Sequence, residues 1–422
     1  MKNKRLLAVC ILLALCLTAC SDTISCPPAE TTGTQIAVCP GCTEVDANLS
    51  FADNLLHMTA ESGNRMLSPY SAKMCLALLA NGAKGETRQQ ILDAIGITDL
   101  DAYNAEVKAL LARYASYAGV MSLETANSLW LNQTTFGGKG KFLSDYQTAM
   151  REYFSAEVRE VTRENAVEEV NAWVNEKTHE KIKSILNEEQ RNFAAALINA
   201  VYFKAGWKEE FPEHLTQKDD FTNADGSISK TEFMQNTETY GYFEKDGIKA
   251  LQIDYGRFGG EEKYVSDKDY NFSMYILLCD DPSASLNVDA FLKDNAPFTS
   301  QRVKVQIPKF ELDYSVGLND ILKTLGMTDA FDEDKADLGG MMDLSAIEGN
   351  LFVSDTLQKT YIKIDEEGTE AAAVTAIICY TTGAWIDTKD PIEFTADKPF
   401  YFAIRDNTSG ELLFVGRYET AE

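Results

Sequence analysis

The stretch that decides the fold runs from Ile364 to Ala384 and reads IDEEGTEAAAVTAIICYTTGA. From Thr369 to Ala376 every side chain except that of Glu370 is small or β-branched, so the segment can pack closely against its neighbours in more than one conformation. Alanine is the best helix former, and Thr369 could cap a helix over the three alanines. The β-branched run that follows them favours a strand instead.

A strand period of two gives this stretch two different faces. Glu370 and Tyr380 lie on one face, and the other carries only Thr369, Ala371, Ala373, Thr375, Ile377 and Cys379. The second face has no charged side chain and is compatible with burial. Because the stretch is acceptable both as an exposed loop and as a half-buried strand, we interpret it as a candidate bistable element.

Glu366 to Ala373 resembles the hinge of the reactive-centre loop in serpins, a family of mostly suicide protease inhibitors. Further motifs of that family occur in order along the chain. They are NRMLSPYS (64–71), VNAWV (170–174), LINAVYFKAGW (197–207), ILKTLGM (321–327) and the run 394–418. The resemblance therefore covers about Ala47 to Tyr418.

This resemblance implies an α+β serpin fold with a large central β-sheet, smaller sheets, about eight or nine helices and an exposed reactive-centre loop. It also implies a serpin domain over 47–422. The residues themselves predict two of its elements. The near-continuous apolar run 194–207 is typical of a strand buried on both faces. The spacing of apolar residues over 166–182 predicts an amphipathic helix.

The resemblance further implies a mechanism in which the target protease supplies the nucleophile. The protease cleaves the loop, and the hinge then inserts as a new strand in the central sheet before the acyl-enzyme is hydrolysed. The implied hinge residues are Glu366, Glu367, Gly368, Thr369, Glu370, Ala371, Ala372, Ala373, Val374 and Thr375. Small residues suit insertion because a large or charged side chain would be buried without a partner.

At the sheet opening, the resemblance implies roles for Ser68, Ser71, Asn199, Trp207 and Gln358. Each also has a purely structural interpretation. The serines could cap a helix, Trp207 could be a core aromatic residue, and Asn199 could be a core amide with its hydrogen bonds satisfied. The sequence does not separate these alternatives.

The scissile bond, counted along the loop as in serpins, falls at Thr382–Gly383, with Tyr380, Thr381 and Ala384 as alternatives. No Arg or Lys lies between Glu370 and Asp387, which disfavours a trypsin-like protease with a cation-binding pocket. Small residues favour elastase-like or subtilisin-like targets. A papain-like cysteine protease stays open, and Tyr380 keeps a chymotrypsin-like protease open.

Two positions depart from the family pattern. Many serpins have a histidine where this chain has Gln358, and glycine is usual where Glu180 stands. Glutamine still donates and accepts hydrogen bonds, so we expect inhibition that is nearly independent of pH between about 6 and 8, where histidine titrates. Glu180 leaves open how the turn after the preceding helix is made.

Residues 1–19 have the layout of a secretory signal, with three basic residues before an apolar run from Leu6 to Leu17. The tetrad LTAC (17–20) resembles a bacterial lipobox, which implies that Cys20 carries a lipid anchor to the cell envelope, with the outer membrane as the expected location. Ordinary secretion with a free Cys20 is the alternative. Residues 20–46, rich in Ser, Thr, Pro, Gly and Cys, read as a flexible tether.

The composition excludes several classes of function. A net charge of −26 repels nucleic acid and anionic lipid. The three histidines have no metal-site spacing, and no GxSxG, phosphate loop or dinucleotide motif is present, so we expect neither an enzyme nor a cofactor or metal. The expected partners of this monomer are target serine proteases, bound covalently. The alternative is a non-inhibitory serpin acting as a surface binding or structural lipoprotein.

Overall fold

The computed structural model describes residues 49–59, 62–118, 121–256, 271–295, 297–347, 349–369 and 390–421. These residues all belong to one compact unit of the chain, Ala37–Glu422. Several predicted features lie outside the described residues: the signal, the tether with Cys20, the hinge from Glu370 to Thr375, and the candidate scissile positions from Tyr380 to Ala384. The domain boundaries themselves stay a prediction.

Eight α-helices form in the described part of the chain. They are α1 (Phe51–Met58), α2 (Pro69–Gly82), α3 (Gly85–Ala94), α4 (Leu100–Ser116), α5 (Ser144–Phe154), α6 (Ala166–Lys177), α7 (Val288–Asn295) and α8 (Asn319–Thr324). The start of α2 follows from its sequence. Ser68 is the N-cap, its hydroxyl accepts a hydrogen bond from the Ser71 amide, and Pro69 takes the first helical position.

The central sheet has the order β10-β11-β12-β4-β2-β3. Its strands are β10 (Phe310–Gly317), β11 (Val353–Ile364), β12 (Gly368–Thr369), β4 (Ala195–Gly206), β2 (Met121–Asn132) and β3 (Glu157–Val161). In β4 every residue except Lys204 is buried, which confirms the predicted buried strand. β4 therefore lies in the middle of this sheet, covered on both faces.

The second sheet has nine strands. Along its main path they are β1 (Arg65–Leu67), β15 (Leu412–Tyr418), β14 (Phe400–Asp406), β8 (Phe272–Cys279), β7 (Ile248–Asp254), β6 (Ile228–Lys245), β9 (Thr299–Pro308) and β13 (Ile392–Thr395), while β5 (Gln217–Thr222) pairs with β6. The 18-residue β6 pairs with β5, β7 and β9, so the expected smaller sheets are joined through it. The α+β class is confirmed.

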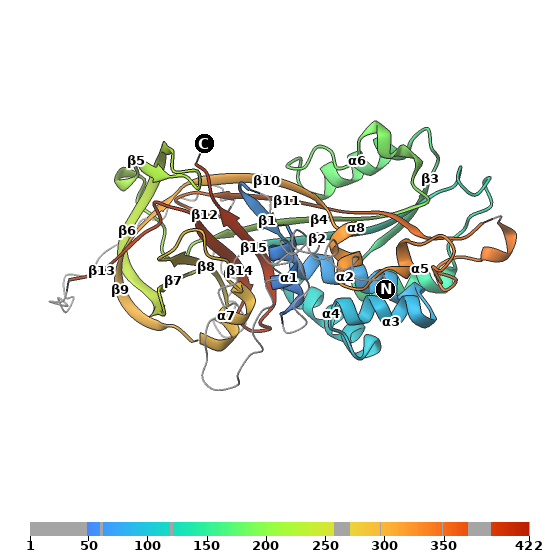
Figure 1. The fold of residues 1–422 in the computed structure, drawn as a ribbon, viewed down its shortest axis with the longest axis horizontal. Coiled ribbons are helices and arrows are strands. Elements are labelled where there is room, and N and C mark those ends of the chain that lie inside the picture. The colour runs from blue at the N-terminus through green and yellow to red at the C-terminus, as the bar shows by residue number, and fades with distance from the viewer. Residues whose placement is uncertain are drawn as a thin grey trace, which may run out of the picture. The chain divides into compact units, whose positions relative to one another are not determined.

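Helices cover the central sheet on both of its faces (Figure 1). On one face α6 packs on β2 and β4, where Trp173, Val170 and Val174 join a cluster with Trp130 and Ile198. On the other face α2 contacts β4 and β2 and also reaches β15 of the second sheet. The position of α2 places its polar N-terminal turn beneath the central strands.

Two predicted elements are shorter in the structure than in the sequence analysis. The helix predicted over 166–182 ends at Lys177, because His179 and Glu180 adopt left-handed φ values of 50° and 66°. The chain thus makes this turn without the glycine that is usual at Glu180. The strand predicted over 303–312 is divided at Lys309 into β9 and β10, after Pro308, which lacks a backbone N–H.

Candidate functional site: the hinge and the sheet opening

The hinge enters the central sheet between β4 and β11. These two strands pair directly, in parallel, from Val353↔Ala195 to Thr360↔Val201. Beyond that pair β12 lies between them, antiparallel to both, with Thr369 opposite Ala205 on one side and Ile364 on the other. The central sheet is thus closed along one part of the β4–β11 seam and held apart at the end where the hinge begins.

Thr369 and Gly368 are held tightly in this gap. Thr369 has no exposed surface, and its hydroxyl shares a hydrogen bond of 2.6 Å with the hydroxyl of Tyr255. A Cβ atom on Gly368 would lie 2.2 Å from the carbonyl oxygen of Ala205, which is closer than atoms approach in proteins. Only glycine fits there. At Thr369 the structure chooses the strand over the helix cap.

Trp207 ties the hinge to the end of β4. Its backbone N–H donates to the carbonyl of Glu367 at 2.9 Å, and its indole N–H donates to the carbonyl of Asp365 at 2.9 Å. The indole ring also stacks on Tyr255, with 4.7 Å between ring centres and 16° between planes. Trp207 is therefore both a core aromatic residue and a direct partner of the hinge backbone.

Glu366 anchors the start of the hinge through its carboxylate. Lys309 Nζ lies 2.8 Å from one carboxylate oxygen, and Thr216 donates to the other at 2.7 Å. Burial alone would raise the pKa of Glu366, but the hydrogen bonds from Lys309 and Thr216 outweigh it and lower that pKa. Burial raises the pKa of the neighbouring Glu367, and the nearby charges of Asp365 and Glu210 add to the effect.

Sequence reasoning missed Lys309, Thr216 and Tyr255. They come from three separate segments, and their residue types carry no pattern that marks a hinge partner. Nothing short of the tertiary arrangement brings them to Glu366 and Thr369.

A buried polar network spans the closed part of the seam. Gln358 and Asn199 lie opposite each other on β11 and β4, and Gln358 Nε2 donates to Asn199 Oδ1 at 3.2 Å. Gln358 also donates to the Ser68 carbonyl at 3.0 Å and accepts from the Ser68 amide at 2.9 Å. Asn199 Nδ2 contacts the Ser71 hydroxyl and donates to Asn127 Oδ1 at 2.6 Å. We call Ser68, Ser71, Asn127, Asn199 and Gln358 the seam network.

Four of the five predicted sheet-opening residues thus meet in one network, which joins both seam strands to the first turn of α2. Trp207 lies apart from them, at the end of β4 where the hinge enters. Ser68 caps α2 and binds Gln358 at the same time, so both interpretations of this residue hold together. Asn127 was not predicted, because its position opposite Asn199 follows from the β2–β4 register.

Comparison with known proteins bears directly on this arrangement. A family model described as Serpin (serine protease inhibitor) matches residues 46–420. The chain belongs to the serpin family. Serpin B8 of Bos taurus is 31% identical to it over 393 residues, covering 89% of this chain and 98% of the relative. Iripin-3 of Ixodes ricinus is 31% identical over 409 residues, covering 89% and 95%.

Solved serpin structures match over most of their length. The thermophilic serpin tengpin in its native state is 28% identical with a TM-score of 0.74, covering 89% of this chain and 93% of tengpin. Arabidopsis AtSerpin1, in a conformation described as native stressed, is 27% identical with a TM-score of 0.72, covering 88% and 95%. Most serpins inhibit proteases and are not enzymes.

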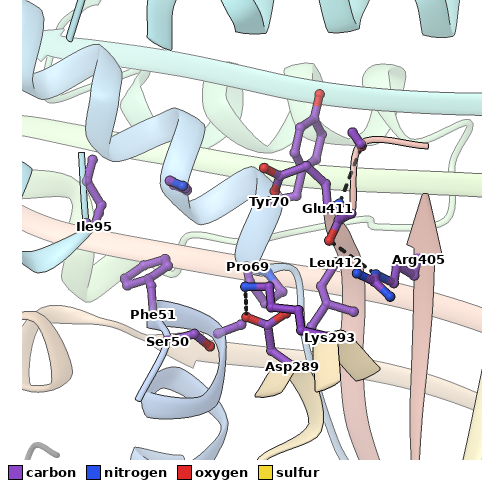
Figure 2. A pocket seen from close by; sticks show the side chains of 15 residues that line it. Ser50, Phe51, Pro69, Tyr70, Ile95, Asp289, Lys293, Arg405, Glu411 and Leu412 are labelled. Carbon is purple, nitrogen blue, oxygen red and sulfur yellow. Dashed lines mark hydrogen bonds and ion pairs between the residues drawn. The ribbon is translucent and has the colours of Figure 1, made fainter. Parts of the chain in front are cut away.

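This serpin also has a cavity away from the hinge, of about 470 Å³, between α1, α2, α7 and the turn from β14 to β15 (Figure 2). Lys73, Lys293, Arg405, Asp289 and Glu411 line it. Lys293 pairs with Asp289 at 2.7 Å, and burial raises the pKa of Glu411. Figure 2 shows Arg405 and Glu411 on the side of the β14–β15 turn and Asp289 and Lys293 on the side of α7.

Within the described ranges, no group of three or more His, Cys, Asp and Glu side chains is arranged to hold a metal ion. Among the helices of that same part of the chain, none has the length and apolarity needed to cross a membrane.

Proposed function

We propose that this serpin is an irreversible suicide-substrate inhibitor of secreted serine proteases, which traps the acyl-enzyme by inserting its cleaved loop into the central sheet. The observation that carries the proposal is the pairing of Gly368 and Thr369 with both β4 and β11. The first two residues of a new strand are already in place, at the open end of a seam that is closed beyond them. Insertion would replace one parallel ladder by two antiparallel ladders.

The register of Thr369 supports a hinge that continues along the seam. Thr369 lies opposite Ala205 and Ile364, so each further residue of an inserted strand moves back by one residue along β4 and β11. Ala371 then meets Phe203 and Ile362, Ala373 meets Val201 and Thr360, and Thr375 falls between Asn199 and Gln358. The flanking side chains are buried, which suits small inserted residues. The Thr375 hydroxyl would take the place of the direct Gln358–Asn199 hydrogen bond.

Glu370, the exception among the small residues, falls on the other face in this register. There it lies between Lys204 on β4 and Lys363 on β11, both partly exposed. A carboxylate between two lysines would be stabilised by their charges. The one charged residue of the early hinge therefore does not oppose insertion.

We infer that the target cleaves at Thr382–Gly383 or at a neighbouring bond between Tyr380 and Ala384. The small residues of this segment support an elastase-like or subtilisin-like protease, with a papain-like cysteine protease also within scope. The lipobox-like LTAC sequence supports an anchor at Cys20 that holds the monomer at a bacterial cell envelope, on its outer membrane. Loss of radiolabelled palmitate from a Cys20→Ser variant would test the anchor.

The test of the proposed function is incubation of the chain from Ala47 onward with pancreatic elastase and with subtilisin, followed by a denaturing gel and mass spectrometry. We expect a covalent complex that survives denaturation, and a cleavage site between Tyr380 and Ala384. Clean cleavage without a complex, by these proteases and by a papain-like protease, would refute inhibition.

The second candidate function is a binding lipoprotein that does not inhibit, and the cavity of Figure 2 is the observation that favours it. The fold alone does not decide between the two functions. Thyroxine-binding globulin, solved in complex with thyroxine, matches with a TM-score of 0.75 at 21% identity. The cationic side chains Lys73, Lys293 and Arg405 suit a ligand with an anionic group. Mass spectrometry of the natively purified protein would detect a retained small molecule.

A further inference from the structure

The segment after α6, residues 178–186, crosses the central sheet where β4 and β11 separate. We call this segment the strap. Thr360 and Val201 form the last direct pair between the two seam strands, and the next residues along them are Tyr361 and Tyr202. Tyr361 packs in the same cluster as α6, and the ring of Tyr202 contacts His179 of the strap. One tyrosine thus stands on each side of the separation, on the face that carries the strap.

On the β4 side the strap is held through His179. Its ring centre lies 4.7 Å from that of Tyr202, and its Nε2 atom lies 2.8 Å from Glu124 Oε1. Glu124 is the residue of β2 that lies directly opposite Tyr202 in the β2–β4 ladder. A single side chain of the strap therefore contacts two neighbouring strands of the sheet.

On the β11 side the strap is held through Lys181 and Ser184. Lys181 Nζ lies over the ring of Tyr361, 5.5 Å from its centre, which is within the range of a cation–π contact. Lys359 of β11 reaches back and donates to the carbonyl of Ser184 at 3.3 Å. Contacts two to five residues apart along the strap thus grip opposite sides of the seam.

The strap is also fastened to α6. The Thr178 hydroxyl accepts from the amide of Ile182 at 3.0 Å, and Asn171 Oδ1 of α6 accepts from the amides of Ile185 and Leu186, at 2.9 Å each. Since α6 packs on β2 and β4, the strap is coupled to that side of the seam. An inserted strand widens the distance from β4 to β11 from one strand spacing, about 4.8 Å, to two. The contacts of the strap with β11 then cannot all persist.

We propose that the strap is a clasp across the seam, and that its contacts with Tyr361 and Lys359 set the rate at which β4 and β11 part to admit a strand. This inference rests on the proposed function, because it describes the barrier to the same insertion. It predicts that loosening either side of the clasp speeds strand uptake without any change in the loop.

The test uses the full chain and a fluorescein-labelled synthetic peptide with the sequence of residues 369–378. Its uptake is followed by fluorescence anisotropy, and its location by native gel. We expect Lys181→Met to take up the peptide three- to tenfold faster than the unmodified chain. The matched control is Lys183→Met, which removes the same charge from an exposed position of the same strap and should leave the rate unchanged.

Glu124→Gln loosens the β4 side and provides a second variant, which should also accelerate uptake. Circular dichroism and urea unfolding establish that each variant is folded. Equal rates for Lys181→Met, Glu124→Gln and Lys183→Met would overturn the clasp. No uptake by the unmodified chain would overturn both the clasp and loop insertion. Uptake in the predicted order without any covalent protease complex would support the clasp and refute only the inhibitor.

Discussion

Replacing Thr369 by arginine tests whether the gap between β4 and β11 must accept small, uncharged residues. Thr369 is fully buried, and its hydroxyl has one partner of suitable geometry, Tyr255. A buried charge without a counter-ion costs several kcal/mol, and about 4 kcal/mol is a conservative figure for this site. Since about 1.4 kcal/mol changes a rate tenfold, insertion should slow by a factor of about 10³.

The consequence for Thr369→Arg is a change of outcome and not of cleavage. The protease still cuts the loop, but deacylation now precedes insertion, so the variant becomes a substrate. The assay is titration of elastase or subtilisin with inhibitor, with complex and cleaved chain separated on a denaturing gel. We expect the covalent complex to disappear. Thr369→Ser, which keeps the hydroxyl, should form complex within about twofold of the unmodified chain. Complex formation by Thr369→Arg at the unmodified yield would refute the reasoning.

Four further predictions concern single side chains. Glu366→Gln removes the ion pair with Lys309 and should lower the free energy of unfolding by about 2 kcal/mol at pH 7; because the pKa of Glu366 is lowered in the folded chain, its contribution is present above about pH 4.5 and is lost below, so urea midpoints of the two proteins should converge near pH 3. Burial raises the pKa of Asp53 to about 6 from 3.8, so its contribution to stability is complete below pH 3.8 and is lost, by about 3 kcal/mol, as pH rises through 6; Asp53→Asn should flatten the dependence of the urea midpoint on pH between 5 and 7, and an unchanged slope would contradict this. Gln358→His should make inhibition depend on pH between about 6 and 8, whereas the unmodified chain stays within about twofold in stoichiometric titrations. Lys204→Glu places a like charge beside the inserted Glu370 and should raise the inhibitor needed per protease about threefold; exposed Lys218→Glu is the control, and equal effects of the two would rule out the register.

The fold was predictable from the sequence because its signals are local and strong. The apolar run of β4 and the Ser-Pro start of α2 each identify their element from adjacent residues. Turns were harder to predict. The left-handed backbone at His179 and Glu180 occurs without glycine, because the Thr178 hydroxyl and Asn171 hold the turn through contacts that no local rule anticipates.

The site was predictable only where one residue carries its own restriction. The sequence by itself determined that the hinge is small, nearly uncharged on one face and free of Arg and Lys up to Asp387, since these are properties of side chains in a row. Tertiary structure alone decided that Glu366 meets Lys309, that Thr369 meets Tyr255, and that His179 and Lys181 grip opposite sides of one seam. Those partners are brought together by strand register and by the packing of α6, and register is a relation between distant segments that neither segment records alone.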